Sequence, residues 1–157
     1  MRIILLGFCW LLSLQGCLMA LRSRRDAADS SAQACVTELN LEVEKIMKIN
    51  GEDYTPEGDE DYARYTECYW KRMGYLDDFG DFIADNLKKM IVESIKLDAH
   101  TKKSMHKIAE LILEQCRHSH GPTIGQKAIR MENCITKYYK VFLRKYSEAE
   151  SNVVNHK

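Results

Sequence analysis

Cysteines and histidines are the residues of this chain that could carry covalent or metal chemistry. Four of the six cysteines lie beyond residue 20, at Cys35, Cys68, Cys116 and Cys134. The first 20 residues indicate export, as argued from their pattern below. An even number of cysteines in an exported chain favours two disulfides, although four cysteines allow three pairings. No CxxC spacing occurs, and we interpret the histidines near Cys116 as solvated, so zinc binding is not expected. Cysteines held in disulfides cannot act as nucleophiles, and we expect no catalytic thiol.

Three common catalytic motifs are absent from the sequence. It has no GxSxG, no HExxH and no glycine-rich phosphate loop. The acidic run at residues 57–61 fits the start of a helix, where carboxylates complement the helix dipole. We therefore predict that the protein is not an enzyme, and we expect neither a cofactor nor a metal.

The first 20 residues have the layout of a secretory signal peptide. Arg2 precedes an apolar run from Ile3 to Leu14, and small residues follow up to Ala20. A lipoprotein cleavage site ending at Cys17 is a rival interpretation, but Gln15 fits that pattern poorly. The run is shorter than the ~20 apolar residues that span a bilayer. We predict a secreted, extracellular protein without stable membrane insertion.

The net charge argues against one large class of partner. The whole chain carries 23 basic and 23 acidic residues. Loss of residues 1–20 would remove one arginine and no acidic residue, leaving 22 basic residues against 23 acidic ones. A chain so close to neutrality lacks the basic field that nucleic-acid binding requires. We therefore expect no nucleic-acid partner.

Apolar residues recur at helical spacing through most of the chain. Val36, Leu39, Val43 and Ile46 form one such stripe, and no segment alternates with a period of two. We predict an all-α, compact single domain of five to six short helices. The expected helical segments are 32–50, 57–73, 82–91, 101–116 and 124–142. We place a flexible N-terminal arm at 21–31, the helical domain at 32–146 and a C-terminal tail at 147–157.

The intervals between the cysteines follow a definite pattern. Seventeen residues separate Cys116 from Cys134, and Gly125 stands midway between them. Arg64 precedes Cys68 by four positions. These intervals resemble those of a known family with six cysteines, and the resemblance implies that Arg64 and Gly125 stand where two of its cysteines would be.

The sequence around the cysteines agrees with that pattern. The segments 68–77 and 126–134 are similar to those that follow the third cysteine and precede the sixth in a known family. On these residues the chain resembles the insect odorant-binding protein family of pheromone and general odorant-binding proteins. It resembles the four-cysteine form, which lacks one of the three disulfides, over roughly residues 32–146.

The resemblance implies two disulfides, Cys35–Cys68 and Cys116–Cys134. It also implies that the absent bridge would have joined positions 64 and 125. Without that bridge we expect the helix of Arg64 and the last helix to separate more easily, around a soft and adaptable cavity. Cysteines introduced at both positions are then expected to raise the melting temperature.

The same resemblance implies a carrier that holds small hydrophobic molecules, such as an odorant or a pheromone, in an internal apolar cavity. Methionine suits such a wall because its unbranched side chain adapts to many shapes. The hydroxyls of Tyr69 and Tyr138 could meet the polar end of a ligand. The expected ligand-binding residues are Tyr69, Trp70, Met73, Leu76, Phe79, Ile83, Leu87, Met90, Ile108, Ile112, Leu113, Tyr138 and Phe142.

An alternative interpretation is a secreted signalling or interaction protein with a filled core, acting through its surface. A receptor or a second copy of the chain could also be a partner. Ligand release could be linked to pH through His100, His106 and His118, although solvated histidines are the simpler interpretation. Displacement of a bound apolar dye by candidate ligands would favour the carrier.

Overall fold

The computed structural model describes residue 26 and residues 28–95 and 102–154. The predicted signal peptide, His100 and Thr101 therefore lie outside the described residues. Helices account for the regular structure of the described part, and the predicted all-α class is confirmed. None of these helices is both long and apolar enough to cross a membrane. The helices are 28–38, α2 (Val43–Asn50), α3 (Glu60–Arg72), α4 (Ala84–Ile95), α5 (Lys102–Cys116) and α6 (Ile124–Val154).

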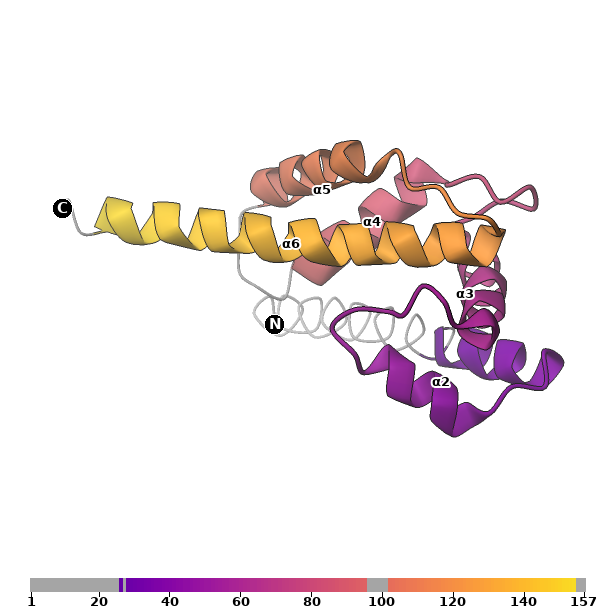
Figure 1. Ribbon diagram of the computed structural model, residues 1–157. Coiled ribbons are helices and arrows are strands. Elements are labelled where there is room, and N and C mark those ends of the chain that lie inside the picture. The colour runs from indigo at the N-terminus through magenta and orange to yellow at the C-terminus, as the bar shows by residue number, and fades with distance from the viewer. Residues whose placement is uncertain (1–25, 27, 96–101, 155–157) are drawn as a thin grey trace, which may run out of the picture.

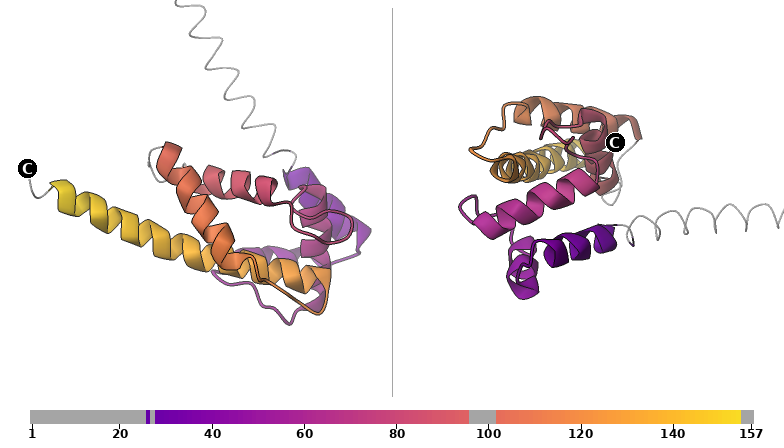
Figure 2. Two further views of the ribbon diagram at one scale, coloured as in Figure 1. Left: turned by 90° about the horizontal axis from the view of Figure 1, so that it is seen from above. Right: turned by 90° about the vertical axis from the view of Figure 1, so that its right-hand side faces the viewer.

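The helices are arranged around α6, the longest of them. Figure 1 shows α6 running across the molecule, with α5 above it, α4 crossing behind it, and α3 and α2 below it. The end-on view of Figure 2 places α3 between α6 and the layer formed by helix 28–38 and α2. The C-terminal end of α6 projects beyond the other helices (Figures 1 and 2).

The predicted helix 32–50 is divided in two because the chain turns at Asn40. Asn40 has a left-handed φ of 51°, a conformation that asparagine often adopts just after a helix. The Leu41 amide donates a hydrogen bond to the Val36 carbonyl at 3.0 Å. This cap ends the first helix and redirects the chain into α2, so the predicted stripe from Val36 to Ile46 belongs to two elements.

Both ends of α3 are set by local sequence. At its start, Asp59 Oδ1 accepts a hydrogen bond from the Tyr62 amide at 2.9 Å, which caps the helix. At its end, Gly74 has a φ of 70° and the Tyr75 amide donates to the Trp70 carbonyl at 2.8 Å. The predicted helix end at Gly74 is confirmed, whereas the helix begins at Glu60 rather than at residue 57.

Replacing Gly74 with alanine is expected to lower the free energy of unfolding by about 1–2 kcal/mol, because a left-handed φ strains any residue with a Cβ. Chemical denaturation at neutral pH measures the change. Gly58→Ala is a suitable control, since a Cβ there would meet nothing within 4 Å. Equal stability of the two variants would contradict the strain at Gly74.

An apolar core lies between α3, α4, α5 and α6. Leu87, Ile108 and Ile112 are each at most 1% exposed and belong to the same cluster. Trp70 joins this cluster from α3, with its ring centroid 5.8 Å from that of Tyr75. A second cluster lies between helix 28–38, α2, α3 and α6. The apolar stripes of the sequence thus pack mainly against one another.

Two disulfides fix the helices to one another. Cys35–Cys68 joins helix 28–38 to α3, and Cys116–Cys134 joins the end of α5 to α6. These are the pairs that the resemblance implies. By the chain-entropy estimate each contributes about 3–4 kcal/mol of stability.

Helices α3 and α6 meet in direct backbone contact at Gly125. A Cβ at Gly125 would lie 2.0 Å from the carbonyl oxygen of Ala63 and 2.5 Å from its carbonyl carbon. The Arg64 side chain is exposed, and its Nη1 atom lies 3.8 Å from Oδ1 of Asp61. Position 125 therefore faces the expected part of α3, and the close backbone contact argues against the loose joint that we expected. Because Gly125 has no side chain, the backbones of α3 and α6 lie closer together than a larger residue at this position would allow.

The ends of the helical domain differ from the predicted boundaries. Residues 28–31, assigned to a flexible arm, are part of the first helix. Helix α6 has 31 residues and continues to Val154, through most of the predicted tail. Residues 143–150 contain no glycine or proline and include strong helix formers such as leucine, arginine, lysine and glutamate. The helix therefore has no local reason to stop at residue 146.

Candidate functional site

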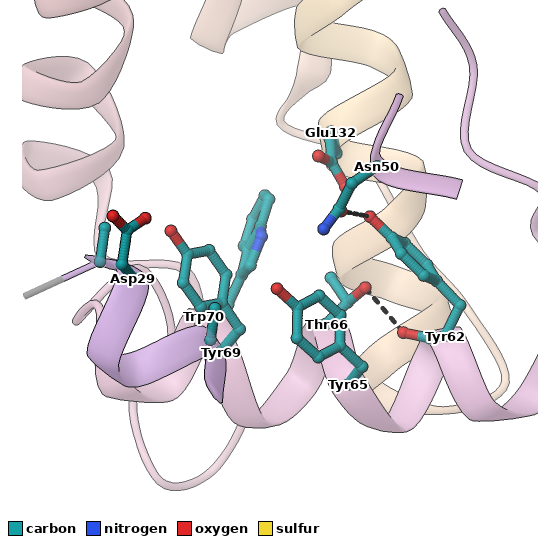
Figure 3. Close-up of a pocket in the computed structure, with 10 residues that line it drawn as sticks. Asp29, Asn50, Tyr62, Tyr65, Thr66, Tyr69, Trp70 and Glu132 are labelled. Carbon is teal, nitrogen blue, oxygen red and sulfur yellow. Dashed lines mark hydrogen bonds between the residues drawn. The ribbon is translucent and has the colours of Figure 1, made fainter. Parts of the chain in front are cut away.

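A cavity of about 280 Å³ lies between helix 28–38, α2, α3 and α6. In Figure 3, side chains of α3 rise from one side, Glu132 of α6 faces them, and Asp29 and Asn50 stand at the edges. Its volume is near the lower end of the ~300–1,000 Å³ common for small-molecule sites. The described residues that line it are Ala28, Asp29, Ala32, Asn50, Tyr62, Tyr65, Thr66, Tyr69, Trp70 and Glu132.

Helical spacing on α3 produces the aromatic wall of the cavity. Tyr62, Tyr65 and Tyr69 follow one another at three and four residues, so they share one face. The rings of Tyr65 and Tyr69 stack with their centroids 5.8 Å apart and their planes 6° apart. Trp70, which is 4% exposed, adds a fourth ring beside Tyr69. One helix thus supplies all four aromatic rings among the described lining residues.

Hydrogen bonds hold the elements around the cavity in place. The Tyr62 hydroxyl donates to Asn50 Oδ1 at 2.5 Å, and the Thr66 hydroxyl donates to the Tyr62 carbonyl at 2.8 Å (Figure 3). The connection between α2 and α3 is fixed to α6 by Asn133. Its Oδ1 accepts from the Thr55 amide, and its Nδ2 donates to the Thr55 carbonyl, both at 2.9 Å. These contacts join α2, α3 and α6 at one end of the cavity.

Glu132 places a carboxyl group of α6 against the cavity. Its Oε2 atom is buried and has no hydrogen-bond partner among the described residues. Burial raises the pKa of this carboxyl group to about 7. A buried charge without a partner is costly. Glu132 is therefore a cavity group whose hydrogen-bonding capacity the described residues leave unused.

The electrostatic character of the cavity is acidic. Asp29 is exposed at its edge, and Glu132 lies deeper. Burial raises the pKa of Tyr69 to about 12 and also raises the pKa of Tyr65, so both hydroxyls keep their protons near neutral pH. The described lining residues include no lysine, arginine or histidine. The described lining therefore offers negative charge and aromatic faces, and includes no cationic group to bind an anion.

The structure separates the predicted lining residues into three groups. Tyr69 and Trp70 line the cavity, whereas Phe79 is 87% exposed on the connection between α3 and α4. The others pack in or near the core, because apolar side chains close up on one another rather than leave a void. Leu76, Leu87, Ile108 and Ile112 are in the core, Met90, Leu113, Tyr138 and Phe142 pack against it, and Met73 and Ile83 are partly buried.

Sequence reasoning missed most of the polar side of the cavity. Tyr62 and Tyr65 had a signal, since they share a stripe with Tyr69. Glu132 also had one, because it stands four residues after the buried Ala128 and beside the apolar face of α6. A carboxylate at such a position needs a reason to be there. Asn50 had no comparable signal, since its place depends on how α2 packs.

The histidines proposed for pH-linked release lie away from the cavity. His106 on α5 and His118 after it are exposed, and neither lines the cavity. A role for them in ligand release stays a hypothesis. The ionisable groups placed to sense a bound molecule are Glu132 and Asp29, together with the tyrosines of α3.

One protein-family model matches most of the chain. The model of the PBP/GOBP family matches residues 19–138, a range that contains all four disulfide-bonded cysteines and all the described lining residues. A search of curated proteins finds no match. Members of this family are secreted binding proteins for small hydrophobic ligands, odorants and pheromones among them, and are not enzymes.

Proposed function

We propose, from the premise that this chain belongs to the PBP/GOBP family, that it is a secreted carrier that binds small molecules in the cavity beside α3. The observation that carries the proposal is the cavity of about 280 Å³, bordered by four aromatic rings and by one buried carboxyl oxygen that has no hydrogen-bond partner among the described residues. Aromatic rings offer a large apolar contact area. A few polar groups among them fix the orientation of a ligand.

The size of the cavity favours compact ligands. Its volume is below that of most drug-sized sites, and the apolar side chains between α4, α5 and α6 are buried against one another. A one-ring alcohol, ester or amine suits this space better than a long-chain fatty acid. For a ligand of about nine non-hydrogen atoms, we expect a Kd of about 10–100 μM, since binding must offset the loss of translational freedom.

Fluorescence of Trp70 provides a direct test. Trp10 and Trp70 are the two tryptophans of the chain, so secreted protein that has lost residues 1–20 reports from Trp70 alone. Titration with 2-phenylethanol is expected to change the emission in a saturable way. Ala32→Phe should weaken binding at least about tenfold, because Ala32 lines the cavity and a phenyl ring would fill it. Ala84→Phe, at an exposed position on α4, should bind like the parent protein.

Two outcomes of the binding assay would contradict the proposed carrier site. Unchanged binding by a folded Ala32→Phe variant would place the ligand elsewhere, and absence of binding by every compact ligand would favour the surface-acting alternative. Secretion has its own measurement: intact mass of the protein recovered from the medium of cultured insect cells. A mass that begins after residue 20 is expected, and retention inside the cells would oppose a secreted carrier.

A further inference from the structure

We propose that the preferred ligand of this cavity is a compact organic amine, bound as its ammonium ion between the Glu132 carboxylate and the aromatic rings of α3. The proposal rests on the proposed carrier function and names the class of ligand for the same cavity. It distinguishes this cavity from one that recognises its ligand by apolar contact alone.

The lining of the cavity has the geometry of a site for an ammonium ion. Figure 3 shows Glu132 on α6 facing the rings of Tyr65 and Trp70 on α3 across the open part of the cavity. The buried Oε2 of Glu132 has no hydrogen-bond partner among the described residues. An ammonium group is a hydrogen-bond donor with a full positive charge, which is the partner that an ionised carboxylate needs. Aromatic faces within about 6 Å attract the same charge through the ring quadrupole.

The charges around the cavity also favour a cationic ligand. The acidic Asp29 lies at the edge of the cavity, and the described lining residues contain no cationic side chain. A ligand with a carboxylate would lie near Glu132 and be repelled by it. A neutral alcohol would avoid repulsion but would gain no ion pair. The lining therefore ranks ligands by charge, with cations above neutral molecules and anions last.

The proton on Glu132 makes binding of an ammonium ion depend on pH. Burial raises the pKa of Glu132, so part of the free protein carries a neutral carboxylic acid at neutral pH. Binding of an ammonium ion requires the carboxylate, and the proton leaves to solvent. The other titratable groups among the described lining residues are Tyr62, Tyr65 and Tyr69 on α3 and Asp29 on helix 28–38, while α2 contributes the neutral Asn50. The tyrosines stay protonated below pH 9, so Glu132 governs the response between pH 5.5 and 8.

Three probes of similar size and shape test the proposal: 2-phenylethylamine, 2-phenylethanol and phenylacetate. Isothermal titration calorimetry on the secreted protein is expected to show tightest binding for the amine and weakest for phenylacetate at pH 8. With a carboxyl pKa of about 7, affinity for the amine should rise at least about tenfold between pH 5.5 and 8. Affinity for the alcohol should change less than about twofold. Titrations in buffers of different ionisation enthalpy should show proton release with the amine alone.

A pair of variants isolates the carboxyl group. Glu132→Gln is expected to abolish the preference for the amine and its pH dependence while keeping the alcohol. Glu114→Gln makes the same charge change at an exposed site on α5, where Glu114 pairs with Arg117, and should behave like the parent protein. Equal affinities for amine and alcohol, or amine binding that ignores pH, would overturn the amine proposal and leave the carrier function standing. Absence of binding by all three probes would count against both proposals.

Discussion

Gly125→Ala is expected to unfold at a markedly lower temperature than the parent protein. The added Cβ would lie 2.0 Å from the carbonyl oxygen of Ala63, well inside van der Waals contact. Because the obstructing atoms belong to the backbone of α3, no side-chain rotation relieves the clash, and α3 and α6 must move apart. Overpacking of this kind costs about 3 kcal/mol or more, equivalent to a fall of roughly 10 °C in Tm for a domain of this size.

Thermal unfolding followed by circular dichroism at 222 nm measures the effect, with Gly58→Ala as the control in open space. The same clash predicts that Arg64→Cys combined with Gly125→Cys fails to stabilise the protein. The resemblance alone leads to the opposite expectation, because it treats positions 64 and 125 as an empty place for a disulfide. A Tm of Gly125→Ala close to that of Gly58→Ala, or a clear rise in the double cysteine variant, would show that α3 and α6 separate freely.

The cysteine intervals and the backbone contact give complementary information about positions 64 and 125. Position 125 does face α3 next to residue 64, as the cysteine intervals indicate. What cysteine spacing cannot reveal is the distance between the two backbones, because that distance follows from which side chains remain. Here the absence of a Cβ at Gly125 allows contact with the backbone of Ala63, and close packing takes the role of a covalent link.

The family resemblance and the local sequence each made one feature of the fold predictable. The cysteine pairing followed from the resemblance, and the end of α3 followed from Gly74, whose φ of 70° suits glycine. The break at Asn40 was less visible, because the apolar stripe continues across it in sequence. A left-handed residue ends a helix without interrupting the hydrophobic pattern, so periodicity alone joined two helices into one.

The cavity could not be located from apolar periodicity. Stripes identify residues that become buried, and most of those predicted for the lining, such as Ile108 and Ile112, are buried against each other. The open space instead lies where rigid rings such as Tyr65 meet polar side chains of other helices. Its position depends on the packing of four helices that are separated in sequence, and that packing is a tertiary property.

Glu132→Gln is expected to change how stability depends on pH, and this follows from the sign of one pKa shift. Burial raises the pKa of Glu132 in the folded protein to about 7, whereas an unfolded chain has a glutamate pKa of about 4.3. Below pH 4 both states are protonated, and the residue costs nothing. Between pH 4 and 7 the unfolded state releases a proton that the folded state keeps, so the stability of the parent protein falls as pH rises.

The neutral glutamine removes that dependence. At pH 8 the variant should be more stable than the parent protein by about 2 kcal/mol, which is the linkage free energy reduced for partial solvation and for the new amide's own hydrogen bonds. At pH 4 the two proteins should have nearly equal stability. Guanidinium denaturation at both pH values measures the difference, and Glu114→Gln is the matched control. A constant difference between parent and Glu132→Gln at the two pH values would contradict the raised pKa.

A residue that lowers stability at neutral pH is more easily explained by a ligand than by the fold. Apolar residues would fill the space around Tyr65 and Trp70 at no such cost. If the carboxylate serves an ammonium ligand, the ligand should repay its cost through binding to the folded state. Saturating 2-phenylethylamine should then raise Tm at pH 8 for the parent protein and much less for Glu132→Gln. Equal shifts for both proteins would separate the stability effect of Glu132 from any role in recognition.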